Sequence, residues 1–404
     1  MRCFEKNESA KRRIFLIILD SVGIGAAPDA EKYGDAGSHT LASCFRSGRL
    51  DIPNLQKLGI YNIDGIACGE RIAAPIGSFG KMTEVSAGKD TTIGHWEIAG
   101  IISSRPLPTY PNGFPEGVIA AFKKATGRGV LCNKPYSGTD VIIGYGQRQI
   151  ETGDLIVYTS ADSVFQIAAH EDVVPVEQLY KYCEAAREIL RGENAVGRVI
   201  ARPFAGSYPD FKRTANRHDF SLQPPSATML TELSSCDFDV IAIGKINDIF
   251  AGQGITEAKP TKDNDDGMKK TMEYLDRDFN GLCFVNLVDF DMLYGHRNDI
   301  PGYTGALNRF DTQLGEFIAE MRDNDILMLA ADHGCDPGTA STDHSREYAP
   351  WLIYGGDIKR GVNLGICSSF ADIGKTISDI LGASADIAGQ SHKKSVLKRQ
   401  NRDM

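Results

Sequence analysis

Aspartates and histidines that could bind metal ions follow three apolar runs of this 404-residue chain. The run Ile14–Leu19 ends at Asp20, Leu282–Val288 leads into Asp289, Asp291 and His296, and Ile326–Ala331 leads into Asp332 and His333. In an open α/β sheet, ligands bind beyond the carboxyl ends of the strands, where side chains that are distant in sequence can meet. We therefore expect these oxygen and imidazole donors to converge on one metal site.

The segment after the third run carries a further histidine. His344 follows His333 by eleven residues, across a loop rich in turn residues. This spacing predicts that the strand end and the loop folding back over it both supply ligands. The alternative is an exposed polar loop, which would not need histidine and aspartate at both of its ends. Cys335 lies beside His333, but a free cysteine is more often a buried apolar residue, so we leave it out of the predicted set.

The predicted ligand set has six members: Asp20, Asp291, His296, Asp332, His333 and His344. Six donors are too many for one tetrahedral catalytic ion that keeps an open position, and they suit two ions. Oxygen and nitrogen donors without thiolate favour Mn²⁺ or Zn²⁺ over Ca²⁺. Two such ions form a clamp for in-line displacement at phosphorus. Taken alone, the segment around Asp291 could equally be a capped helix start with a surface histidine.

A glycine-flanked turn supplies a candidate nucleophile. Thr91 and Thr92 lie in the segment Ser86–Glu97, near the expected start of a helix. A metal-bound hydroxyl loses its proton more easily than a free one, and a helix N-terminus stabilises negative charge by about 0.3–1 kcal/mol. These residues alone do not decide between the two threonines. The alternative is an ordinary threonine N-cap without chemistry.

Basic residues cluster between positions 198 and 217, namely Arg198, Arg202, Lys212, Arg213 and Arg217. Guanidinium groups bind phosphate oxygens through paired hydrogen bonds, so this cluster favours a phosphorylated substrate, although such clusters are often only solvated surfaces. Lys245 follows the expected core strand Val240–Ile243 and is a further candidate. Ser160 and Asp162 follow another expected strand, where they could bind sugar hydroxyls.

The spacing of apolar residues predicts an α/β fold. Continuous apolar runs such as Ile14–Leu19 and Ile326–Leu329 indicate central strands that are covered on both faces. Between such runs, Gly305–Arg322 has apolar residues at every third or fourth position, which predicts a helix. This alternation predicts a doubly wound, mostly parallel sheet.

A change in composition marks an inserted second domain. Its expected elements are strands at Leu155–Tyr158 and Arg198–Ala201 and a helix at Val176–Leu190. Because candidate ligands lie on both sides of this insertion, the first domain must be discontinuous. We expect a metal-binding phosphotransfer core over residues 1–104 and 223–404, and an inserted α/β cap domain for substrate binding over residues 105–222.

Composition excludes several classes of function. The formal net charge of −9 argues against nucleic-acid binding. The nine cysteines are scattered without a C-x-x-C pair, which indicates reduced thiols in a cytosol rather than a disulfide framework. The apolar run after Arg13 is too short for a signal peptide or a membrane span. We expect a cytoplasmic enzyme without a membrane, nucleic-acid or protein partner.

Together these segments resemble the phosphopentomutase family of the alkaline phosphatase superfamily, from about Arg13 to about Gly374. The resembling motifs are Asp20–Gly25 with Pro28–Ala30, Gly88–Thr91 with Gly94–Glu97, Tyr158–Val164, Gly197–Phe204, Asn216–Asp219 and the two metal segments. The resemblance implies interconversion of ribose 1-phosphate and ribose 5-phosphate, and of the 2-deoxyribose pair, through a pentose bisphosphate. It also implies two Mn²⁺ ions per chain and a sugar bisphosphate activator such as glucose 1,6-bisphosphate.

The resemblance also assigns roles to single residues. By its motif, Thr91 rather than Thr92 carries the phosphoryl group. The implied ligands of one ion are Asp20, Thr91, Asp332 and His333, and those of the other ion are Asp291, His296 and His344. The implied substrate contacts are Ser160, Asp162, Arg198, Ile200, Arg213 and Lys245.

Two other functions could use the same core residues. A metal-dependent phosphomonoesterase or phosphodiesterase would share the chemistry as far as the phosphoenzyme, and the segments around Ser160, Arg198 and Arg213 favour the mutase. A catalytically inert metal-binding or scaffold protein would be expected to have lost Thr91 or a ligand, and none is missing.

Overall fold

The chain folds into two compact units, here called unit 1 and unit 2. The structure is a computed structural model that describes residues 11–160, 162–383 and 385–399. Unit 1 comprises Met1–Pro106 and Pro224–Met404, and unit 2 comprises Leu107–Gln223. The expected divisions at 104/105 and 222/223 lie two residues and one residue before these boundaries. None of the described helices has the length and apolar character that crossing a membrane requires.

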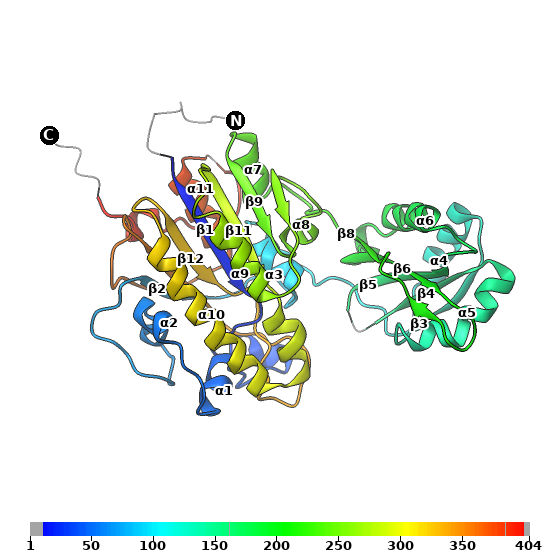
Figure 1. The fold of residues 1–404 in the computed structure, drawn as a ribbon, viewed down its shortest axis with the longest axis horizontal. Helices are drawn as coiled ribbons and strands as arrows, with labels where there is room; N and C mark the ends of the chain where they lie inside the picture. Colours follow the sequence, from blue (N-terminus) through cyan, green and yellow to red (C-terminus); the bar gives the residue numbers. More distant parts are fainter. Residues whose placement is uncertain (1–10, 161, 384, 400–404) are drawn as a thin grey trace. The chain divides into compact units, whose positions relative to one another are not determined.

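Unit 1 is built on an eight-stranded, mostly parallel sheet (Figure 1). Its strands, in spatial order, are β10 Glu257–Lys259, β9 Asp239–Ile243, β11 Gly281–Leu287, β1 Arg13–Leu19, β12 Ile326–Ala330, β13 Ala349–Gly355, β2 Ser78–Met82 and β14 Asn363–Cys367. The first five strands are parallel, and β13 runs opposite to both of its neighbours. Every residue of β1 is buried, as expected for a strand covered on both faces.

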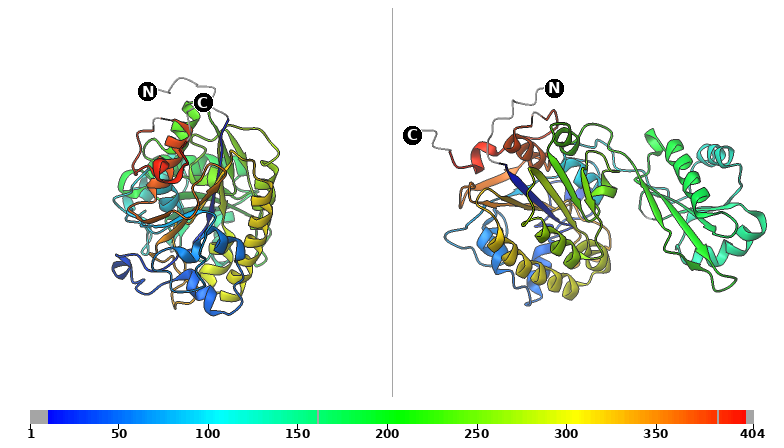
Figure 2. Two further views of the ribbon diagram at one scale, coloured as in Figure 1. Left: turned by 90° about the vertical axis from the view of Figure 1, so that its left-hand side faces the viewer. Right: turned by 45° about the horizontal axis from the view of Figure 1, so that its top comes forward.

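Helices cover both faces of this sheet. One group contains α1 Thr40–Arg46, α2 Pro53–Leu58, α9 Asn264–Glu273 and α10 Ile300–Glu320, and the other contains α3 Thr91–Ile98, α7 Met229–Ser235, α8 Ile246–Ile249 and α11 Ala371–Leu381. In Figure 2, α10 and α11 lie on opposite sides of the sheet. The short helix α12 Lys393–Val396 packs against α11. The prediction of a doubly wound α/β fold is confirmed.

The register of the central strands places their polar ends together. Leu19 of β1 pairs with Leu287 of β11, and Ile18 pairs with Ala330 of β12. Because the three strands are parallel, the residues that follow them leave the sheet at the same edge. Asp20 and Asp332 therefore come close together although 312 positions separate them in the sequence (332 − 20).

Unit 2 contains a six-stranded mixed sheet with helices on both faces. Its strands are β3 Val130–Pro135, β4 Leu155–Thr159, β5 Val164–His170, β6 Arg198–Ala205, β7 Lys212–Arg213 and β8 His218–Ser221, of which β7 and β8 both pair with β6. Alternate residues of β4 enter two cores. Leu155 and Val157 pack with α4 Glu116–Thr126 and α6 Val176–Ile189, whereas Ile156 and Tyr158 pack with α5 Asp140–Thr152, as the two-residue period of a strand requires.

Candidate active site

The first group of predicted ligands lies directly beyond β1 and β12. Donor atoms of Asp20, Asp332 and His333 lie within 4.8 Å of one another, and all three side chains are buried. His333 Nε2 is 3.3 Å from Asp20 Oδ1 and 3.4 Å from Asp332 Oδ2. Such spacing between buried donors is what ligands of a common ion show.

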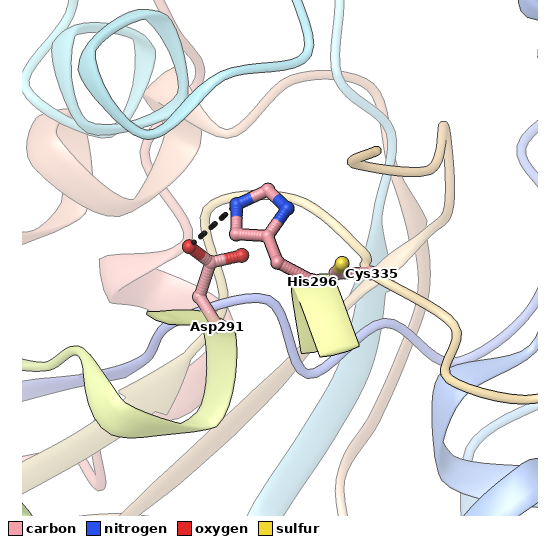
Figure 3. A group of neighbouring side chains, drawn as sticks. All are labelled: Asp291, His296 and Cys335. Atoms are coloured by element: carbon pink, nitrogen blue, oxygen red, sulfur yellow. Dashed lines mark ion pairs between the residues drawn. The ribbon is translucent and has the colours of Figure 1, made fainter. Parts of the chain in front are cut away.

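The second group adjoins the first through His333. A π-helical turn, Phe290–Tyr294, presents Asp291, and the 3₁₀ turn that follows presents His296. Asp291 Oδ2 is 3.2 Å from His296 Nε2, and its Oδ1 is 3.3 Å from His344 Nε2 (Figure 3 shows the Asp291–His296 pair). The rings of His333 and His344 have centroids 4.0 Å apart. All six predicted donors therefore form one continuous cluster.

Unpaired buried atoms indicate that this cluster fits cations. Asp20 Oδ1, Asp332 Oδ2, Asp291 Oδ1 and His344 Nε2 are buried, and in the described part of the chain none of them makes a hydrogen bond of regular geometry. The three carboxylate oxygens only face imidazole nitrogens at 3.0–3.4 Å. Buried polar atoms are normally satisfied, and uncompensated buried carboxylates are costly. Burial and the charges of Asp332 and Asp291 raise the pKa of Asp20. Divalent cations would satisfy all four atoms and remove the repulsion among the carboxylates.

Asp291 differs from Asp20 because two imidazoles, those of His296 and His344, face its carboxylate, whereas Asp20 faces the imidazole of His333. Burial raises the pKa of Asp291, but hydrogen bonds with His296 and His344 outweigh burial and bring this pKa well below its usual value. The hydrogen bond to Asp291 in turn raises the pKa of His296 to about 9. Without a metal ion, a positively charged imidazole therefore compensates Asp291.

Cys335 lies beside the second group, and the sequence prediction left it out of the ligand set. Its Sγ is within 4.8 Å of donor atoms of Asp291 and His296 (Figure 3). Burial raises the pKa of the Cys335 thiol, which disfavours the thiolate that a metal would need. The sulfur thus lies beside a cluster that already has the six predicted oxygen and nitrogen donors.

Thr91 lies at the first position of α3 and contacts the first group. Its Oγ1 is 3.1 Å from His333 Nε2. The N-cap of α3 is Asp90, whose Oδ1 accepts hydrogen bonds from the backbone N–H groups of Thr92 and Ile93, both at 3.1 Å. The alternative role of Thr91 as an N-cap is therefore wrong. Its hydroxyl is directed at the donor cluster instead.

A glycine and a histidine fit α3 closely against the end of β12. A Cβ atom at Gly94 would lie 2.1 Å from the Asp332 carbonyl oxygen, so only glycine allows this approach. His95, one helical turn after Thr91, has its Nδ1 2.9 Å from the Thr91 carbonyl oxygen and 3.0 Å from Asp332 Oδ2. Asn286 donates a hydrogen bond of 2.8 Å to Asp20 Oδ2. These three residues orient the predicted ligands and the nucleophile.

Sequence reasoning missed His95 and Asn286 as parts of the site. Both carried a signal. His95 follows Thr91 by four positions, which places the two on one helix face. Asn286 is a polar residue within the buried apolar strand β11, where a polar side chain needs a specific partner.

Unit 2 has a separate cavity of about 260 Å³. Five of the six predicted substrate contacts line it: Ser160, Asp162, Arg198, Ile200 and Arg213. Arg202, Gln166 and Arg217 line it as well. The sixth predicted contact, Lys245, lies in unit 1, where it follows β9 and precedes α8.

The arginines of this cavity are only partly compensated. Asp219 pairs with Arg198 at 3.5 Å and with Arg217 at 2.7 Å. In the described part of the chain, neither Arg202 nor Arg213 has a carboxylate within 4.0 Å, and their side chains bond instead to Gln166 and Thr139. Burial and the nearby positive charge of Arg217 lower the pKa of Arg202. Unpaired guanidinium groups in a cavity favour an anion such as phosphate.

Comparison with known proteins accords with this geometry. A model of the metalloenzyme superfamily matches residues 12–385. Phosphopentomutase of Lachnoclostridium phytofermentans is 57% identical over 389 residues, covering 96% of this chain and 100% of that protein. Phosphopentomutase of Acetivibrio thermocellus is 54% identical over 387 residues, with coverage of 96% and 100%. The chain belongs to the phosphopentomutase family.

The solved structure of the PH0037 protein from Pyrococcus horikoshii shares the fold. Its TM-score is 0.50 at 15% sequence identity, and the match covers 94% of this chain and 100% of that one.

Membership of the phosphopentomutase family confirms the resemblance, the α/β fold of the alkaline phosphatase superfamily and the expectation of an isomerase of this type. It also makes the chain a metal-dependent enzyme, in agreement with the donor cluster. The roles of single residues stay predictions.

Thermal stability with and without metal tests whether the buried charge of Asp20 is balanced by a bound cation. We expect Asp20→Asn to raise the Tm of the metal-free protein, because it removes a buried charge whose pKa is already raised by burial and by Asp332. The same variant should show a smaller rise in Tm than the wild type when Mn²⁺ is added, because it lacks a ligand. Thermal unfolding with EDTA and with Mn²⁺ measures both effects. An equal Mn²⁺ shift in the variant would remove Asp20 from the metal site.

The close approach of α3 yields a second prediction. Gly94→Ala would force α3 away from Asp332 and move Thr91, and a displacement near 1 Å lowers turnover by about a hundredfold. Gly117→Ala in α4 is the matched control, because nothing lies within 4 Å of a Cβ there, and it should change stability by less than about 1 kcal/mol. Steady-state kinetics of both variants measures the effect. Wild-type turnover in Gly94→Ala would show that the site tolerates a displaced α3.

Proposed function

We propose that this enzyme interconverts ribose 1-phosphate and ribose 5-phosphate, and the 2-deoxyribose pair, through phosphorylated Thr91. The observation that carries the proposal is the 3.1 Å distance between Thr91 Oγ1 and His333 Nε2, at the margin of a six-donor cluster. A hydroxyl held against metal ligands at the start of a helix is placed to form a phosphoenzyme. The phosphopentomutase relatives, at 54–57% identity, support the substrate class.

The donor cluster would hold two Mn²⁺ ions. Asp20, Thr91, Asp332 and His333 would bind one ion, and Asp291, His296 and His344 the other. This division is supported by the group Asp20, Asp332 and His333 and by the contacts of Asp291 with His296 and His344. Because His333 also lies within 4.8 Å of donor atoms of Asp291 and His344, the two proposed ion sites adjoin. When bound, the ions supply positive charge that stabilises the transferring phosphoryl group and lowers the pKa of the threonine hydroxyl.

Thr91 would carry the phosphoryl group between two sugar hydroxyls. Phospho-Thr91 donates its phosphoryl group to the free hydroxyl of a pentose monophosphate, which gives a pentose bisphosphate and free Thr91. The bisphosphate then returns its other phosphoryl group to Thr91. The dipole of α3, whose first residue is Thr91, favours negative charge at this end of the helix. A sugar bisphosphate such as glucose 1,6-bisphosphate would supply the first phosphoryl group.

Unit 2 would bind the sugar phosphate. Arg198 and Arg213 would bind phosphate oxygens, and Ser160 and Asp162 the sugar hydroxyls, with Ile200 forming an apolar wall. Lys245, which follows β9 in unit 1, is the sixth proposed substrate contact. Unit 2 would serve as the cap domain, and the enzyme must keep water from phospho-Thr91, because hydrolysis would make it a phosphatase.

We also propose a cytoplasmic location, with small pentose phosphates as the partners of the enzyme. Among the described residues, the cysteines at positions 44, 68, 132, 183, 283, 335 and 367 form no disulfide, which suits a reducing compartment.

A coupled assay tests the proposed reaction. Purified protein with Mn²⁺ and a catalytic amount of glucose 1,6-bisphosphate should convert ribose 1-phosphate to ribose 5-phosphate without releasing phosphate. Release of phosphate without the isomer would identify a phosphomonoesterase and overturn the mutase.

Thr91→Ala tests the covalent route. We expect no detectable turnover and no phosphorylated protein by intact mass, because the acceptor oxygen is gone. Metal content should stay close to that of the wild type, because the carboxylate and imidazole donors remain. Thr92→Ala is the control and should retain both phosphorylation and turnover. Mutase activity in Thr91→Ala would exclude a phosphothreonine intermediate.

Arg213→Ala tests the cavity of unit 2. Loss of a charge-assisted hydrogen bond costs about 1.5–3 kcal/mol, so we expect KM for ribose 5-phosphate to rise about tenfold or more. Arg191→Ala is the control, because Arg191 is an exposed arginine of the same unit that pairs with Glu188 and does not line the cavity. Unchanged kcat and KM in Arg213→Ala would remove Arg213 from the substrate site.

A further inference from the structure

A buried arginine follows the ligand loop and contacts the segment before Thr91. Arg346 lies two residues after His344 and is 1% exposed. Its Nη atoms donate to three backbone carbonyls, those of Glu84 at 2.7 Å, Ser86 at 2.8 Å and Gly88 at 2.9 Å. The guanidinium also pairs with the side chains of Glu84 at 2.6 Å and Asp29 at 3.1 Å. All five N–H donors of this guanidinium therefore have protein acceptors.

A lysine makes the reciprocal contact. Lys89 precedes Asp90 and Thr91, and its Nζ donates to the carbonyl oxygen of His344 at 2.6 Å. Asp35 joins both contacts, because its Oδ2 accepts hydrogen bonds from Lys89 Nζ at 3.0 Å and from the Arg346 backbone N–H at 2.9 Å. Hydrogen bonds thus join two segments that are about 255 residues apart. In one set the side chain comes from the ligand loop (Arg346), and in the other it comes from the segment before Thr91 (Lys89).

The backbone N–H groups of the segment before Thr91 form hydrogen bonds with α3 itself. Glu97 of α3 is buried, and its carboxylate accepts hydrogen bonds from the backbone N–H groups of Val85 and Ser86 at 2.6–3.1 Å. The N–H groups of residues 85–86 therefore bond to the helix that carries Thr91, whereas carbonyls of residues 84–88 bond to Arg346. The position of this segment sets where α3 begins relative to the ligand loop.

We propose that Arg346 and Lys89 are positioning residues that fix Thr91 against the metal-ligand loop. This inference rests on the proposed function of Thr91 and goes beyond it. The two residues touch no reacting atom. They act by holding the segment 84–90 and the loop 343–346 at one separation, so that Thr91 Oγ1 keeps its distance from the cluster with and without a phosphoryl group. Phosphoryl transfer depends on such alignment, because displacements near 1 Å lower rates by about a hundredfold.

Arg13 offers a matched control in the same unit. It is 2% exposed, forms a bidentate pair with Asp325 at 2.6 and 2.7 Å, and donates to the carbonyls of Tyr274, Leu275 and Arg277. Its bonding thus matches that of Arg346, with carboxylate and carbonyl partners. However, it begins β1, whereas Asp20 lies beyond the other end of that strand.

The test compares Arg346→Lys with Arg13→Lys. Lysine keeps the charge but cannot reproduce a planar fork of five donors, so both variants should lose thermal stability. Only Arg346→Lys should lower kcat, by at least about tenfold, while KM for ribose 5-phosphate and bound Mn²⁺ stay within about twofold of the wild type. A loss of kcat no larger than that of Arg13→Lys would overturn the proposal.

A second variant and a second measurement keep the test independent of folding and of the assay. Lys89→Met removes the reciprocal contact from a half-buried position, and we expect the same selective loss of kcat. Amide hydrogen exchange of residues 84–91 should be faster in Arg346→Lys and Lys89→Met, and unchanged in Arg13→Lys. If the wild type shows no mutase activity, the proposed function is wrong. The positioning role is then tested only by the rate of amide hydrogen exchange in residues 84–91. Unchanged exchange in both site variants would overturn it.

Discussion

The structure depends on the burial of three carboxylates at one edge of a parallel sheet. Asp20, Asp291 and Asp332 are at most 6% exposed, and within the described ranges each has an oxygen that makes no hydrogen bond of regular geometry. Burying like charges together is unfavourable unless cations are present. Histidines compensate Asp291 in the chain alone, but the pKa of Asp20 is raised by burial and by its acidic neighbours. Divalent cations would therefore balance the charge of this cluster, and the surrounding elements keep its donors in place.

Rigid elements fix this arrangement from several directions. Parallel strands set the positions of Asp20 and Asp332 through their register. Gly94 lets α3 approach β12, and Asp90 caps the helix so that the Thr91 hydroxyl is left for the donor cluster. Hydrogen bonds of Arg346 then join the segment before α3 to the loop that contains the predicted ligand His344. Preorganisation of this kind is costly to build but leaves little to rearrange during phosphoryl transfer.

Sequence patterns predicted the local elements and the meeting of donors at the strand ends, but not the strand directions or the individual polar contacts between distant segments. The apolar runs that became β1, β9, β11 and β12 and the pattern that became α10 were recognised, because their periods lie within a few residues. The donors at strand ends followed from the same reasoning. The antiparallel strand β13 was not predicted, because pairing direction depends on chain connections that have no local signature. Likewise, the polar contacts of Asn286 and Arg346 join residues 191–266 positions apart, and no spacing rule reaches them.

Each unit, taken by itself, has a cluster of like charges that the described residues do not fully balance. In unit 1 the unmet charge is negative and lies on carboxylate oxygens, which favours divalent cations. In unit 2 it is positive and lies on Arg202 and Arg213, which favours a phosphate dianion. A sugar bisphosphate has a phosphate at both ends. Each phosphate could bind either to cations held by the donor cluster or to the arginines of the unit 2 cavity. The proposed mutase reaction would need both sets of residues, because an enzyme that recognises a phosphate in only one way could transfer a phosphoryl group but could not exchange the two positions.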